Sequence, residues 1–166
     1  GQRQRISIAM ALAHRPDIII ADEPTTALDV TVQAQVLKQM NELRKSNNTA
    51  LLFITHDFAV VSQICDRVIV MYGGRIVESG DTRDVIEKPL HPYTQMLMEC
   101  IPVLGEPERE INAIPGQPPR IDKPVAGCAF APRCPRAGER CHEEVPPLVR
   151  SGEGRSVRCF YPLGDT

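Results

Sequence analysis

A short apolar run that ends in two carboxylates constrains this chain more than any other feature. Residues 17–22 read Asp-Ile-Ile-Ile-Ala-Asp, and Glu23 and Pro24 follow directly. A continuous apolar run of this length is typical of a strand that is buried on both faces of a parallel sheet. Ligands of open α/β sheets gather at the carboxyl ends of the strands, so Asp22 and Glu23 are expected at a binding edge.

Helices and strands are expected to alternate along the first part of the chain. Apolar spacing predicts helices over residues 6–14, 30–45 and 58–65, with a second buried strand over residues 50–54. Gly73-Gly74 predicts a hairpin between strands at 67–71 and 75–79. From Pro102 onward prolines become dense, and they interrupt both helices and ladders. We therefore expect an open α/β sheet followed by a loop-rich tail.

A histidine is expected beside the two carboxylates, because His56 follows the predicted strand 50–54. Mg²⁺ prefers oxygen ligands, which makes one carboxylate a candidate metal ligand. The other can polarise a water for attack on a γ-phosphate, and His56 can sense that phosphate. The alternative interpretation is two solvated loop acids and a structural histidine.

Four ordered motifs resemble those of the ABC transporter ATPase family. Gly1–Arg5 is similar to the end of the signature Leu-Ser-Gly-Gly-Gln, and Ile18–Pro24 resembles the Walker B motif. Thr26–Asp29 resembles the D-loop, and His56 falls where the switch histidine stands. The resemblance implies these roles: Mg²⁺ ligand for Asp22, general base for Glu23, γ-phosphate contact for His56, partner-subunit contact for Asp29, and signature loop for Gly1 and Gln2.

The sequence contains no Gly-x-x-x-x-Gly-Lys-Ser/Thr motif, whose lysine and backbone amides cradle the phosphates of ATP. The chain also opens within a motif, at the position of the signature. We therefore expect a C-terminal part of a longer ATPase subunit, with negligible ATP affinity and turnover by itself.

Four cysteines cluster in the tail, at Cys128, Cys134, Cys141 and Cys159. In a cytosolic setting, clustered cysteines favour metal ligation over disulfides. Four thiolates can hold zinc or an iron–sulfur cluster, and the spacing lacks the Cys-x-x-Cys pairs usual for structural zinc. His142 is a weaker candidate ligand, and an exposed loop position is the alternative for it.

The tail resembles the C-terminal region of the oligopeptide/dipeptide importer ATPases. The resemblance rests on His91–Thr94, on Pro-Gly-Gln-Pro-Pro at 115–119, and on Cys-x-Phe-x-x-Arg-Cys at 128–134. It implies a [4Fe–4S] cluster on the four cysteines, with Zn²⁺ as the alternative. It also divides the chain into residues 1–90, the C-terminal part of a P-loop ABC nucleotide-binding domain, and residues 91–166, a loop-rich extension.

The resemblance implies an energy-coupling ATPase subunit of a peptide importer that uses ATP and Mg²⁺. Its partners would be a second ATPase subunit, two transmembrane permease subunits and, indirectly, an external solute-binding protein. It would sit at the cytoplasmic face of the bacterial inner membrane. The net charge of −2 gives no argument for nucleic acid. The alternatives are an importer ATPase for nickel or glutathione, a soluble non-transport ABC ATPase, and a stand-alone metal-binding or redox module.

Overall fold

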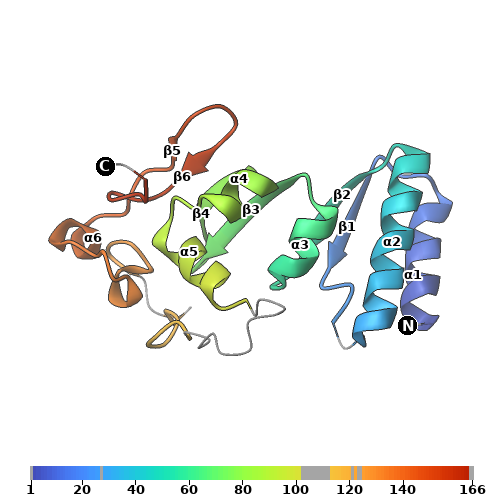
Figure 1. Cartoon of the computed structure of the whole chain (residues 1–166), viewed down its shortest axis with the longest axis horizontal. Coiled ribbons are helices and arrows are strands. Elements are labelled where there is room, and N and C mark those ends of the chain that lie inside the picture. Colours follow the sequence, from blue (N-terminus) through green and yellow to red (C-terminus); the bar gives the residue numbers. More distant parts are fainter. Residues whose placement is uncertain (1, 27, 102–112, 121, 123–124, 165–166) are drawn as a thin grey trace. The chain divides into compact units, whose positions relative to one another are not determined.

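The computed structural model describes residues 2–26, 28–101, 113–120, 122 and 125–164 (Figure 1). The chain forms two compact units, Gly1–Cys65 and Asp66–Thr166. Both contain helices and strands, so the predicted α/β class is confirmed. Among the described residues, no helix combines the length and the apolar character needed to cross a membrane.

The first unit is built on two parallel strands, β1 (Ile18–Asp22) and β2 (Ala50–Ile54). Their register pairs Ile18 with Ala50 and Asp22 with Ile54, so the two strands end together. α1 (Gln2–Ala13) precedes β1, α2 (Val30–Asn47) connects the strands, and α3 (Phe58–Ile64) follows β2. Parallel strands require such a crossover, and a helix is its usual form.

α2 has clear signals at both of its ends. The Asp29 side chain accepts a hydrogen bond from the Val32 amide at 2.9 Å, which satisfies one of the unpaired amides of the first turn. Asn48 ends the helix in the left-handed conformation, with φ of +52°, which asparagine tolerates better than most residues. Arg44 and Lys45 in the last turn complement the helix dipole.

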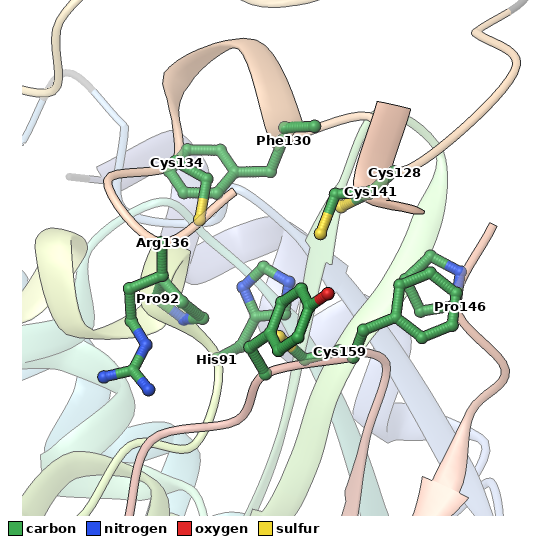
Figure 2. A pocket seen from close by; sticks show the side chains of 12 residues that line it. His91, Pro92, Cys128, Phe130, Cys134, Arg136, Cys141, Pro146 and Cys159 are labelled. Atoms are coloured by element: carbon green, nitrogen blue, oxygen red, sulfur yellow. The ribbon is translucent and has the colours of Figure 1, made fainter. Parts of the chain in front are cut away.

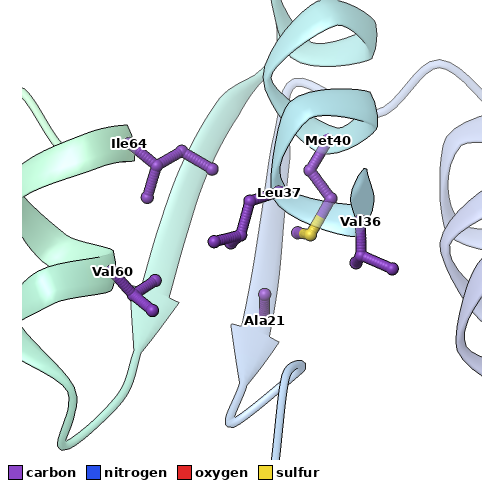
Figure 3. Packing of buried hydrophobic residues seen from close by; sticks show 6 residues of the cluster. All are labelled: Ala21, Val36, Leu37, Met40, Val60 and Ile64. Atoms are coloured by element: carbon purple, nitrogen blue, oxygen red, sulfur yellow. The ribbon is translucent and has the colours of Figure 1, made fainter. Parts of the chain in front are cut away.

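The core of this unit lies between α2, α3 and one face of the sheet (Figure 3). Figure 3 shows Leu37 of α2 between Ile64 of α3 and Ala21 of β1. Leu51 and Phe53 of β2 pack against the same cluster. The buried members of the core are Ala21, Val36, Leu37, Met40, Val60 and Ile64.

The prediction that both strands are buried on two faces is wrong within the part of the chain that the structure describes. Successive strand residues point to opposite faces, and α2 and α3 cover only the face that carries Ala21 and Phe53. On the other face Ile20 is 65% exposed and Leu52 is 46% exposed, and Ile18 and Ile54 are exposed as well. The apolar run therefore predicted the strand correctly. Its prediction of burial is correct for one face of the strand and wrong for the other.

The second unit is built on an antiparallel sheet in the order β3-β4-β6-β5. β3 (Arg67–Tyr72) and β4 (Arg75–Asp81) form the predicted hairpin, and Gly73 and Gly74 turn it with φ of +54° and +75°. Both glycines adopt the left-handed values that a type I′ turn requires. β5 (Val149–Arg150) and β6 (Ser156–Val157) are short strands of the tail.

Three helices and one 3-10 turn complete the second unit as far as its residues are described. α4 (Thr82–Glu87) follows β4 directly, α5 (Pro92–Glu99) starts with proline at its first position, and α6 (Glu139–Glu143) is a single short helix. The 3-10 turn spans Ala131–Arg133. Proline fits the first turn of α5, because it lacks an amide that would have no partner there.

The boundary between the compact units differs in position from the predicted boundary between residues 90 and 91. β6 of the tail pairs with β4 of the hairpin through Glu78 and Ser79, so the hairpin belongs to the same unit as the tail. The division into residues 1–90 and 91–166 describes regions of a family and stays a prediction.

Shortening the Leu37 side chain should destabilise the first unit. Leu37 is buried at the centre of the cluster, so Leu37→Ala should lower the free energy of unfolding by about 2–5 kcal/mol. Lys38→Ala, on the exposed side of the same turn, should change it by about 0.5 kcal/mol or less. Urea unfolding of the full chain measures both values. Equal values for the two variants would contradict the assigned core.

Candidate functional site

The carboxyl ends of β1 and β2 place Glu23 beside His56. The Glu23 amide donates to the Ile54 carbonyl at 2.9 Å, which continues the ladder one residue past Asp22. Glu23 then takes a φ of +44°, a left-handed value that is uncommon for a residue with a side chain. Such strained residues persist only where their surroundings hold them, and they concentrate at functional sites.

His56 occupies the turn between β2 and α3, and its neighbours fix that turn. The Asp57 amide donates to Thr55 Oγ1 at 3.0 Å. The Asp57 carboxylate in turn accepts from the Ala59 amide at 2.9 Å and caps α3. The backbone on either side of His56 is therefore held by local hydrogen bonds, while its ring is free to face the end of β1.

Both carboxylate oxygens of Glu23 have partners. Oε1 lies 3.2 Å from His56 Nδ1, and Oε2 accepts from Thr26 Oγ1 at 2.9 Å. The His56 side chain is 80% exposed and that of Glu23 is 46% exposed, so the pair opens to solvent. A carboxylate held from two sides and accessible from a third direction can accept a proton from a bound water.

Hydrogen bonding keeps Glu23 ionised. The hydrogen bond from Thr26 holds the pKa of Glu23 below its usual value, and the hydrogen bond from His56 acts in the same direction. Because the folded-state pKa is lowered, these bonds contribute stability above the ordinary pKa of glutamate and lose it as the pH falls through the folded-state value. At neutral pH the side chain is therefore a base.

Asp22 ends β1 directly before Glu23 and lines a cavity of about 170 Å³ whose lining includes neither Glu23 nor His56. Ser7, Ile8 and Ala11 of α1 and Met40 and Arg44 of α2 line the same cavity. The structure thus brings together two of the three residues predicted to share one pocket, and the magnesium role of Asp22 stays a prediction.

The other predicted nucleotide-site residues have structural positions of their own. Asp29 caps α2, so its predicted contact with a partner subunit would add to this local role. Gln2 is the first residue of α1, and its role in a signature loop stays a prediction. Gly1 lies outside the described residues.

The four tail cysteines line one cavity (Figure 2). Gly127 allows two of them to meet, because a side chain there would collide with the Cys141 carbonyl and the His142 backbone. The Cys128 amide accordingly donates to the Cys141 carbonyl at 2.8 Å. All four are thiols without a disulfide, and the space between them is about 10 Å³, enough for roughly one water molecule.

Burial disfavours the charged form of three of these thiols. It raises the pKa of Cys128 and Cys134, and it raises the pKa of Cys159 to about 11. Thiols in such surroundings stay protonated near neutral pH, and a bound metal must displace the protons. The described residues contain no group of three or more His, Cys, Asp or Glu side chains arranged to hold a metal ion. Neither the predicted [4Fe–4S] cluster nor its zinc alternative is confirmed.

Of the arginines at positions 133, 136, 140 and 158, which lie near the cysteines in sequence, Arg136 lines the cavity. Arg133 instead donates to the carbonyls of Ile114 and Pro115 and to the Tyr72 hydroxyl. Arg158 donates to the carbonyls of Ile76 and Pro146. Arg140 pairs with Glu144 and lies 4.0 Å over the Phe160 ring. These three arginines have structural roles, so only Arg136 is placed to offset charge at the thiols.

The cavity also contains a histidine that the sequence patterns did not predict as a site residue. His91 lines the cavity, whereas His142 is exposed on α6. Burial lowers the pKa of His91 to about 4, against a smaller opposing effect of the Glu78 charge. Its place before Pro92 marks it as a helix cap, and nothing in the local pattern indicates that its ring faces the cysteines.

Comparison with known proteins finds family matches in both units. Residues 77–141 match the family "Oligopeptide/dipeptide transporter, C-terminal region", and residues 1–26 match the family "ABC transporter". The chain is 52% identical over 163 residues to the oligopeptide transport ATP-binding protein OppD of Salmonella typhimurium, covering 98% of this chain and 48% of that protein.

Two further relatives are similar over nearly the whole of this chain. The oligopeptide transport ATP-binding protein AppD of Bacillus subtilis is 52% identical over 160 residues, covering 96% of this chain and 49% of the relative. The dipeptide transport ATP-binding protein DppD of Escherichia coli is 46% identical over 166 residues, covering 99% of this chain and 50% of the relative. The chain thus spans about half the length of the curated relatives it matches.

The hydroxyl of Thr26 should control the acidity of Glu23. Thr26→Val removes the hydrogen bond that contributes most to the lowered pKa, so the pKa of Glu23 should rise toward its ordinary value. Carboxyl carbon shifts followed by NMR during a pH titration of the nucleotide-free, magnesium-free chain give this pKa. Thr31→Val, at an exposed position of α2, is the matched control and should leave it unchanged. An unchanged pKa in Thr26→Val would refute the assigned hydrogen bond.

Proposed function

The chain belongs to the oligopeptide/dipeptide family of ABC transporter ATP-binding proteins, and from this premise we propose that it is part of an ATPase subunit that drives peptide import. The observation that carries the proposal is the contact between Glu23 Oε1 and His56 Nδ1 at the tips of two parallel strands. A general base and a phosphate-sensing ring must lie within reach of one water and one phosphate, and these two side chains meet that requirement.

Glu23 acts as the general base in this proposal. Its ionised carboxylate takes a proton from the water that attacks the γ-phosphate, and Thr26 holds the carboxylate in place through its second oxygen. The left-handed backbone at Glu23 directs the side chain away from the strand and toward the turn of His56. The proton acceptor is thereby positioned before substrate binds.

His56 links the base to the phosphate. Nδ1 faces Glu23, which leaves Nε2 on the exposed side of the ring for a γ-phosphate oxygen. An imidazole that carries protons on both nitrogens donates to the carboxylate and to the phosphate together. In this proposal His56 contacts the base through Nδ1 and the phosphate through Nε2.

ATP and Mg²⁺ are the substrate and cofactor that the family implies. Asp22 is proposed to hold Mg²⁺, mainly through water, and its exposed carboxylate at a strand end suits a cation that keeps several waters. Gly1, Gln2 and Asp29 are proposed to act across a dimer of ATPase subunits. No P-loop motif occurs in this sequence, so the phosphate cradle must come from other residues of the assembled ATPase.

The proposed partners follow from the names of the relatives, which are oligopeptide and dipeptide transport proteins. We propose a second ATPase subunit and two transmembrane permease subunits as direct partners, with an external solute-binding protein acting through the permeases. The chain would then work at the cytoplasmic face of the bacterial inner membrane.

We further propose that Cys128, Cys134, Cys141 and Cys159 hold a [4Fe–4S] cluster. Four thiols line one cavity, which supports a common ligand, and Arg136 lies beside them to offset negative charge. A single zinc ion needs its sulfurs about 2.3 Å from one point. Zn²⁺ on the same four thiols is the alternative. Loading requires the half-buried thiols to turn outward, because the present space is small.

The cluster would supply a structural staple for a loop-rich unit. Between Gly116 and Val149 the described chain contains one 3-10 turn and one short helix, so few backbone hydrogen bonds hold it. A centre bound by three cysteines of this segment and by Cys159 would join loops that are distant in sequence. The free energy of binding the centre would then contribute to the free energy of folding.

Replacing the base should stop turnover and spare binding. In the assembled ATPase, Glu23→Gln should slow ATP hydrolysis by about 10²–10⁴-fold, the usual range for loss of a general base. Nucleotide affinity should stay close to that of the wild type, because the amide keeps the shape of the site. Glu42→Gln, on the exposed face of α2, is the matched control. Steady-state hydrolysis and nucleotide binding measure the two effects, and unchanged turnover in Glu23→Gln would disprove the base assignment.

Metal analysis tests the cysteine site. Anaerobically purified protein should be brown and contain iron and acid-labile sulfide, and Cys134→Ser should lose most of both. Cys65→Ser, outside the cavity, should retain them. Colourless wild-type protein with stoichiometric zinc would overturn the cluster assignment.

A further inference from the structure

The His91 ring is buried in the cysteine cavity with one nitrogen that has no partner. The residue is 1% exposed and lines the cavity together with the four cysteines (Figure 2). Nδ1 accepts a hydrogen bond from the Tyr93 amide at 3.0 Å and so caps α5. Nε2 is buried and has no hydrogen-bond partner within the described chain. Buried polar groups without partners are rare in native proteins, so this nitrogen requires an explanation.

The tautomer of His91 follows from the cap. A backbone amide can only donate, so Nδ1 acts as an acceptor and carries no proton. The proton of the ring is then on Nε2, which becomes an N–H donor. A nitrogen that carries a proton has no lone pair for a metal. His91 is therefore a hydrogen-bond donor toward the cavity rather than a fifth ligand.

A buried carboxylate fixes the position of this ring. Glu78 of β4 is fully buried and accepts from the amides of Leu90 and His91, each at 2.9 Å. Arg155 donates to the same carboxylate at 2.7 Å. The Phe130 ring, itself buried, packs at 5.9 Å from the imidazole. The backbone, the cap and the packing together prevent the ring from turning its Nε2 toward solvent.

The cavity offers sulfur as the acceptor. Its lining contains Cys128, Cys134, Cys141 and Cys159. The remaining side chains are apolar or aromatic apart from Arg136, which can only donate, and the hydroxyl of Tyr161. Neutral thiols are weak acceptors, whereas thiolates and sulfides that bind metal carry negative charge and accept N–H donors well. The unpaired nitrogen and the four thiols would satisfy each other once a sulfur-ligated centre forms.

We propose that His91 donates a hydrogen bond from Nε2 to a sulfur of the centre held by the four cysteines, an inference that rests on the proposed [4Fe–4S] cluster. His91 is thus a positioning residue that adjusts the electronic properties of the centre without binding iron. A hydrogen bond to sulfur stabilises the reduced state, which carries more negative charge, and so raises the reduction potential. Through His91, the motif His-Pro-Tyr-Thr thereby caps the start of α5 and also provides a donor in the cysteine cavity.

Two substitutions separate the functions of the two ring nitrogens. His91→Asn keeps an acceptor near the position of Nδ1, and asparagine is a favourable N-cap residue. Its shorter side chain leaves no N–H donor at the position of Nε2. His91→Gln keeps an N–H group near the position of Nε2 and removes the cap. In the full chain purified anaerobically, His91→Asn should lower the reduction potential by an amount equal to about a tenfold change in the equilibrium constant, or about 59 mV for one electron. His91→Gln should retain most of the wild-type potential.

The outcomes distinguish this inference from the proposal on which it rests. Wild-type protein without iron and sulfide contradicts the cluster, and the inference falls with it. A cluster whose potential is the same in the wild type and in His91→Asn contradicts the inference alone. A cluster whose potential falls equally in both variants shows that the cap, rather than the donor, is responsible, and this result also overturns the inference.

A measurement on the wild type avoids reliance on folded variants. The chain contains four histidines, so ¹⁵N-histidine labelling is selective. Pulsed EPR of the reduced cluster should detect a weak ¹⁵N coupling of the size of an N–H···S contact. No coupling, or a coupling as strong as that of an iron-bound nitrogen, would contradict the assignment of His91 as a donor.

Discussion

The in-register pairing of two parallel strands determines the position of everything at the candidate catalytic site. Ile18 pairs with Ala50 and Asp22 with Ile54, so β1 and β2 end at the same level. The Glu23 amide adds one more bond to the ladder, and the chain then turns through a left-handed residue. A shift of one residue would turn every side chain of the strand to the opposite face and would separate Glu23 from His56.

The second unit depends on one buried carboxylate in a comparable way. Glu78 binds Arg155 and the two amides before α5, and this links the hairpin, the entry to α5 and the tail. Breaking such a buried pair leaves a charge without compensation, which is far more destabilising than the loss of a surface pair. The same interaction holds His91 in the cysteine cavity. Structural support and the proposed adjustment of a metal centre therefore depend on the same residues.

Local patterns in the sequence predicted the elements and the proximity of Glu23 and His56 at the candidate site. The apolar runs and the Gly73-Gly74 pair gave β1, β2 and the hairpin nearly to the residue, because each depends on neighbours in the chain. The meeting of Glu23 and His56 followed from the rule that parallel strands end on one edge. The separate cavity of Asp22, the exposed face around Ile20 and the pairing of β4 with β6 did not follow, since each depends on contacts that no local spacing encodes. The position of His91 in the cavity was not predicted either, because its place before Pro92 indicates a helix cap and not the direction of its ring.

The central claim is that Glu23 and His56 act as one unit in hydrolysis. A double-mutant cycle of turnover in the assembled ATPase, with Glu23→Gln, His56→Ala and the double variant, tests this most directly. Residues that act together are strongly non-additive, so the double variant should be about as slow as the slower single variant. Turnover reduced by the product of the two single effects would show two independent residues and would contradict the account.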